Sequence, residues 1–136
     1  MVKCRIFTID DNLKEVSPDG LYGKHLFGTD ISVSVVKFVL PNGPNLPAKS
    51  HDHGEEISLQ IEGGCAVGEG EGDEGNPVTT VGEGDVLVIP ASTRHYGDNT
   101  YSKNGTSLRM NVVTPARKEF GPEDETPYYP LKEIGK

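Results

Sequence analysis

The chain has 136 residues, of which 34% are hydrophobic, 17 are Gly and 10 are Pro. This length suits one domain with its own hydrophobic core, and the many Gly and Pro residues favour short strands and turns over long helices. The formal net charge of −8, with basic residues scattered along the chain, argues against nucleic acid or an anionic membrane surface as a partner.

The N-terminus and the cysteines indicate an intracellular protein. The first eight residues contain no apolar signal-peptide core, and no apolar run approaches the roughly 20 residues that cross a bilayer. Cys4 and Cys65 are the two cysteines, and their separation matches no metal-binding pattern. We therefore expect a cytoplasmic protein with two reduced thiols.

The N-terminal part of the chain contains one clear strand. Residues 31–40 are dominated by β-branched side chains, and the segment Pro41–Pro44 stops them. Upstream, we expect a short strand at residues 4–9 and a loop at residues 10–20. A proline-rich loop then leads to the segment His51–Glu56.

The middle of the chain alternates short apolar segments with glycine-rich turns. Residues 56–62 alternate strictly between polar and apolar side chains, which is typical of a strand with one buried face. The acidic tract 68–76 lacks the regular ligand spacing of a calcium loop, so we expect a solvated hairpin loop there. Further strands are predicted at residues 65–67, 78–81, 85–89 and 108–114.

The C-terminal segment, residues 115–136, contains four prolines, which predict an extended tail. No segment has a sustained helical period, so the fold class expected is all-β, a sandwich or barrel. We expect residues 1–30 to be an N-terminal extension that packs on a barrel formed by residues 31–114.

Three of the four histidines fall in two short segments with an acid nearby. His51 and His53 are two residues apart, so in an extended chain they point the same way. Glu56 follows them, and His95 comes from a second segment after the stop at Pro90. Three imidazoles and one carboxylate suit a single divalent ion, namely Fe, Mn, Zn, Ni, Co or Cu, and leave one or two positions for water or substrate.

These two segments resemble the two motifs of the cupin superfamily. In the first, His51, His53 and Glu56 are followed by Gly63 with six residues between Glu56 and the glycine. In the second, Gly84, Pro90, His95 and Asn99 match in register. The resemblance covers about residues 31–114 and implies a cupin jelly-roll barrel, the double-stranded β-helix. It also implies a metal held by His51, His53, Glu56 and His95.

The segments depart from the cupin pattern at two places. The gap between His53 and Glu56 is two residues, shorter than the family usually has, which leaves Glu55, or no carboxylate, as alternatives to Glu56. Ser92 stands where the second motif usually has Gly, which should alter the turn without moving His95.

The strand that begins at Glu56 predicts the character of the pocket wall. A period of two places Ser58 and Gln60 on the same inward face, which favours a polar, oxygen-rich ligand. Gln60 is a candidate catalytic residue, and so is Arg109, which could anchor a substrate carboxylate from the last strand beside Asn111. His25 could join the site or be structural.

The opposite face of this strand carries Ile57, Leu59 and Ile61, which need cover from the N-terminal segment and a second subunit. We therefore expect a homodimer. The function expected is a metal-dependent single-domain cupin enzyme acting on a small polar, oxygenated metabolite, by isomerase, lyase, cyclase or dioxygenase chemistry. The alternative is a non-catalytic binding or sensor module for a sugar-like or carboxylate ligand.

Overall fold

The computed structural model describes residues 4, 6, 8–10, 13–17, 20–40, 53–71 and 75–117. These residues form an all-β fold, and among them no helix is long and apolar enough to span a membrane. The strands are β1 (Lys14–Ser17), β2 (Leu21–Phe27), β3 (Ser32–Val39), β4 (Glu55–Glu62), β5 (Gly64–Glu69), β6 (Val78–Val81), β7 (Val86–Ile89), β8 (His95–Thr100) and β9 (Thr106–Thr114).

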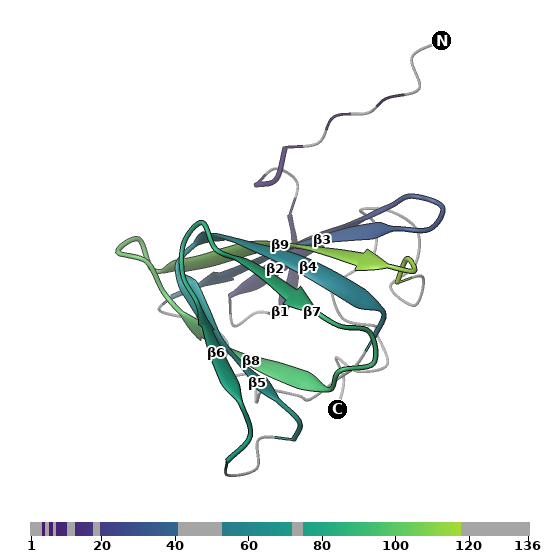
Figure 1. The fold of residues 1–136 in the computed structure, drawn as a ribbon. Coiled ribbons are helices and arrows are strands. Elements are labelled where there is room, and N and C mark those ends of the chain that lie inside the picture. Colours follow the sequence, from purple (N-terminus) through teal and green to yellow (C-terminus); the bar gives the residue numbers. More distant parts are fainter. Residues whose placement is uncertain are drawn as a thin grey trace.

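The strands form two antiparallel sheets that lie face to face (Figure 1). The larger sheet has the order β1-β2-β3-β9-β4-β7, and the smaller has the order β6-β5-β8. Strand β4 continues into β5 at Gly63, whose φ of 68° is the left-handed conformation that glycine adopts without a steric penalty. This turn carries the chain from the larger sheet into the smaller one.

The inner face of the larger sheet is apolar in one part and polar in another. Leu21, Val36 and Phe38 form a buried cluster, against which the half-buried Tyr101 packs. A polar row crosses β2, β3, β9 and β4, because the register pairs His25 with Ser34, Ser34 with Asn111, and Asn111 with Ser58. All four of these polar side chains are buried. The interior of the barrel is therefore partly polar.

The outer face of the larger sheet is covered at one side and exposed at the other. Val35 is 1% exposed, and the N-terminal segment lies over this region because Lys24 donates to the Thr8 carbonyl and Lys37 pairs with Asp10 at 3.0 Å. On β4 and β7, by contrast, the apolar side chains Ile57, Val86 and Val88 are 47%, 60% and 56% exposed.

Most strands that the sequence predicts are present. β3 corresponds to the strand expected at 31–40, and β4, β6, β7 and β9 agree with their predicted segments within two residues. The acidic tract joins the paired strands β5 and β6, as expected for a hairpin loop, although residues 72–74 lie outside the described residues.

The prediction for the N-terminal part was wrong in two respects. The described residues within 4–9 are not in a strand, and β1 lies inside the segment 10–20 that was expected to be a loop. Strand β2 was also missed, because LYGKHLF places Lys and His at buried positions and so hides the alternation of a half-buried strand. Both β1 and β2 extend the larger sheet beyond β3. The predicted C-terminal tail lies outside the described residues beyond Arg117.

Candidate metal centre

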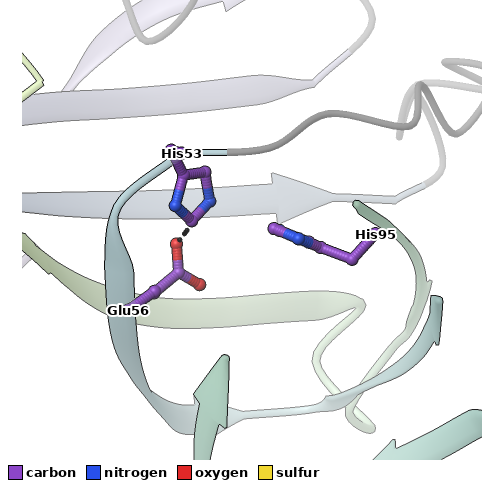
Figure 2. A group of neighbouring side chains, drawn as sticks. All are labelled: His53, Glu56 and His95. Carbon is purple, nitrogen blue, oxygen red and sulfur yellow. Dashed lines mark ion pairs between the residues drawn. The ribbon is translucent and has the colours of Figure 1, made fainter. Parts of the chain in front are cut away.

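Side chains from both sheets meet at one end of the barrel (Figure 2). His53 lies two residues before β4, Glu56 is the second residue of that strand, and His95 begins β8 in the smaller sheet. One ligand atom from each of the three lies within 4.8 Å of the other two. Figure 2 shows His95 approaching the other two side chains from the opposite side of the space between them.

The backbone around His53 is held by the end of β9 and by the turn that precedes His95. A Cβ at Gly54 would lie 2.1 Å from the Thr114 carbonyl oxygen, so only glycine allows this close approach to the end of β9. The Ser92 amide donates to the His53 carbonyl at 2.8 Å. This hydrogen bond ties the turn before His95 to the backbone of His53.

Backbone carbonyls fix the orientation of both imidazoles. His53 Nδ1 lies 2.8 Å from the Gly54 carbonyl oxygen, and His95 Nδ1 lies 2.8 Å from that of Thr93. A carbonyl oxygen can only accept, so each Nδ1 carries the proton, and the Nε2 of each neutral ring is the atom that could bind a metal. The two rings are nearly perpendicular, with centroids 4.9 Å apart.

The Glu56 carboxylate is buried and held at both oxygens. Its Oε1 lies 3.2 Å from His53 Nε2, and its Oε2 accepts a hydrogen bond from Ser58 Oγ at 2.5 Å. Burial lowers the pKa of His95 below its ordinary value, partly opposed by the hydrogen bond to the Thr93 carbonyl. A neutral His95 therefore presents an Nε2 lone pair to the same space as the carboxylate.

This donor set fits a divalent transition metal. One nitrogen from each imidazole and a carboxylate oxygen converge, and electron-pair donors that face one another are held together best by a cation. Imidazole nitrogen with one carboxylate suits zinc, iron, copper or nickel better than calcium or magnesium. Glu55 is exposed on the other face of β4, so between the two glutamates it is Glu56 that faces this space.

Two candidate residues deeper in the barrel have different surroundings. Gln60 Nε2 donates to the Glu62 carbonyl at 2.8 Å and has longer contacts with Ser107 Oγ and the Leu108 carbonyl, at 3.2 Å and 3.3 Å. The two longer contacts join Gln60 to β9, and its assignment as a catalytic residue stays a prediction. Arg109 crosses the interior instead, and its Nη2 donates to Asn99 Oδ1 on β8 at 2.7 Å.

The remaining histidine of the described residues belongs to the polar row. His25 is fully buried, its Nδ1 lies 2.9 Å from Ser34 Oγ, and its ring stacks on Phe27. It is not part of the group formed by His53, Glu56 and His95. Sequence reasoning did not find this His-Ser pair, because nothing local links two residues on neighbouring strands.

Comparison with solved structures identifies the fold. The chain superimposes on an RmlC-like cupin from Shewanella frigidimarina with a TM-score of 0.63 and 17% identity, over 85% of this chain and 93% of that one. This chain has the cupin fold. KdgF from Halomonas sp. is also similar, with a TM-score of 0.58 and 23% identity over 78% of this chain and 89% of that one. The double-stranded β-helix predicted from the sequence is thereby confirmed.

A third similar structure is the hydroxypropylphosphonic acid epoxidase from S. wedmorenis, with a TM-score of 0.58 and 18% identity. The match covers 81% of this chain and 59% of the epoxidase, so the chain spans less than two thirds of the length of that enzyme. Another similar structure is of the iron(II) form of this enzyme. No family model matches the sequence, and no curated protein matches it.

The cupin fold explains the two departures from the sequence motifs. Ser92 has a φ of 59°, the left-handed conformation in which the cupin motif usually has Gly, so the turn is kept despite the substitution. The short gap after His53 still brings Glu56 into the group, because Glu56 lies on the inner face of β4. His51 lies outside the described residues, and its role as a ligand stays a prediction.

Proposed function

We propose that this protein is a metal-dependent cupin enzyme that acts on a small, polar, oxygenated metabolite. The observation that supports this most directly is the convergence of His53, Glu56 and His95 within 4.8 Å, with both imidazoles oriented by backbone carbonyls. His51 would complete the ligand set. Enzymes are found among the similar structures, including the iron(II) form of the epoxidase, which supports iron as one of the candidate metals.

The residues around the centre have distinct parts in this proposal. A divalent ion held there would supply Lewis-acid polarisation of a substrate oxygen. Ser58 holds one carboxylate oxygen of Glu56, so the other faces His53 in a fixed position. The polar wall on β4 and β9, formed by Ser58 and Asn111, offers hydrogen bonds to an oxygen-rich substrate.

The rival proposal is a non-catalytic binding module that uses the same interior. The buried polar row of His25, Ser34, Asn111 and Ser58 would suit a sugar-like ligand whether or not a metal is present. The two proposals differ in the role of the metal, because binding in the module would survive its removal.

Metal analysis of the full-length protein tests the leading proposal. Purified without added metal and then dialysed against zinc or iron(II), it should retain about one equivalent. The variants His53→Ala and His95→Ala should lose this metal while keeping the β-sheet circular dichroism spectrum, and the exposed Glu83→Ala serves as the control. Failure of the wild type to retain any transition metal would refute the enzyme proposal, and retention by both histidine variants would refute the ligand set.

We also propose that the protein is a homodimer. The exposed Ile57, Val86 and Val88 form an apolar outer face on β4 and β7, which a second copy would cover. Light scattering coupled to size-exclusion chromatography should give twice the monomer mass, and Val88→Glu should shift it to one monomer. A monomeric wild type at micromolar concentration would contradict this.

A further inference from the structure

Arg109 carries a positive charge into the barrel without a carboxylate to balance it among the described residues. Its Nη2 is bound to the neutral Asn99, and its guanidinium lies over the Phe38 ring, 5.3 Å from the centroid. Its Nη1 is buried and has no hydrogen-bond partner among those residues, and the Cys65 thiol, which also meets the guanidinium, is a neutral group. A guanidinium taken out of water in this way is unfavourable unless an anion or an acceptor meets it.

Asn111 presents the complementary group one step along the same strand. Its side chain is 6% exposed, and its Oδ1 is buried with no hydrogen-bond partner within the described part of the chain. Arg109 and Asn111 are two residues apart on the inner face of β9 and so point the same way. Together they offer a positively charged donor, Arg109 Nη1, and an acceptor, Asn111 Oδ1, each without a hydrogen-bond partner among the described residues.

The register places both residues in line with the metal centre. Along β4 and β9, Glu56 pairs with Val113, Ser58 with Asn111, and Gln60 with Arg109. Each of these steps is two residues, or about 7 Å of strand. A ligand that reaches from the centre towards Arg109 therefore passes Asn111 and the hydroxyl of Ser58.

We propose that Arg109 and Asn111 form a binding site for a small hydroxycarboxylate, whose carboxylate meets Arg109 Nη1 and whose hydroxyl donates to Asn111 Oδ1. This rests on the proposed function in one respect, since the metal would hold the other end of the same ligand. A divalent ion with one carboxylate ligand would, together with Arg109, make the interior positive, although the chain as a whole carries a net charge of −8. The site would therefore select anions by local charge.

Gluconate and sorbitol provide a matched pair of probes, because they differ mainly in a carboxylate replaced by a hydroxymethyl group. Dissociation constants are measured by NMR titration of the full-length protein, both zinc-loaded and stripped with EDTA and dialysed. The wild type should bind gluconate at least about tenfold more tightly than sorbitol in both forms, as expected for hydrogen bonds to a charged group.

Arg109→Gln should reduce this preference to about one in the metal-free form and leave zinc uptake unchanged. Arg109→Lys keeps the charge but loses the planar fork, so it should retain part of the preference. Lys37→Gln is the matched control, because it removes a positive charge from the outer face, where Lys37 pairs with Asp10. It should leave the preference as in the wild type.

The outcomes separate this inference from the proposed function. Equal binding of gluconate and sorbitol by the wild type, or an undiminished preference in a folded Arg109→Gln variant, overturns the inference. If Arg109→Gln does not fold, Asn111→Leu decides, because it should weaken both probes several-fold, and unchanged affinities overturn the proposed site. A protein that retains no metal but prefers gluconate refutes the metal proposal alone.

Discussion

Replacing Glu56 by Gln tests the role of the carboxylate in the proposed metal centre. The change keeps the size of the side chain, removes the charge and replaces one acceptor oxygen by an amide. Glu56 is 7% exposed, and its Oε1 lies 3.2 Å from His53 Nε2, so its charge acts on the centre with little screening by water. We expect the affinity for zinc to fall substantially while the strands of the barrel stay intact.

The size of the effect follows from ligand linkage. Removing even an indirect partner of a metal ligand weakens metal binding about 10- to 100-fold, so a direct ligand should reach the upper end of that range. With zinc at about 100 times the wild-type dissociation constant, the metal stabilises the folded protein by about 2.7 kcal/mol. A 100-fold weaker variant would gain about 0.4 kcal/mol at the same concentration.

Thermal melts with and without zinc measure this difference. For a domain of this size each kcal/mol shifts the melting temperature by about 4 °C, so zinc should raise it by about 10 °C in the wild type and about 2 °C in Glu56→Gln. Glu55→Gln is the matched control, because Glu55 is the exposed neighbour on the other face of β4. An equal response of Glu56→Gln and the wild type would refute the assignment, and a loss confined to Glu55→Gln would transfer it to Glu55.

Three further predictions concern single residues. Ser92→Gly should stabilise the protein by about 1 kcal/mol in urea unfolding, because Ser92 has a φ of 59° and glycine adopts this conformation without the penalty of a side chain; an unchanged midpoint would contradict this. Burial lowers the pKa of His95 in the folded protein. As the pH falls below about 6.5, this imidazole is therefore protonated first in the unfolded chain. The metal-free protein should lose stability as the pH falls from about 6.5 through the folded-state pKa. A urea midpoint that is the same at pH 7.5 and 5.5 for the wild type, or an equal slope in His95→Gln, would refute that origin. Burial raises the pKa of Cys65, against the opposing charge of Arg109, so Cys65 should react with a thiol reagent much more slowly than the exposed Cys4 until urea is added; equal rates in the folded protein would contradict its burial.

Local patterns were sufficient to predict several strands and the character of one face. The alternation in residues 56–62 placed Glu56, Ser58 and Gln60 inward, and all three are buried. This succeeded because side-chain direction in a strand depends only on a period of two. The same rule failed for β2, in which Lys24 and His25 are both buried. Their polar groups are tolerated there because Lys24 donates to the Thr8 carbonyl of the N-terminal segment and His25 is hydrogen-bonded to Ser34 on β3.

The sequence by itself determined the residue types of the candidate metal centre, their spacing and the cupin resemblance, because motif spacing and strand period are local properties. Tertiary structure decided that Glu56 rather than Glu55 joins His53 and His95, since this depends on how β8 in the smaller sheet faces β4 in the larger one. It also decided that Arg109 reaches Asn99 across the barrel and keeps Nη1 without a partner among the described residues. Such contacts depend on register and on the packing of two sheets, which join residues far apart in the chain and leave no local pattern.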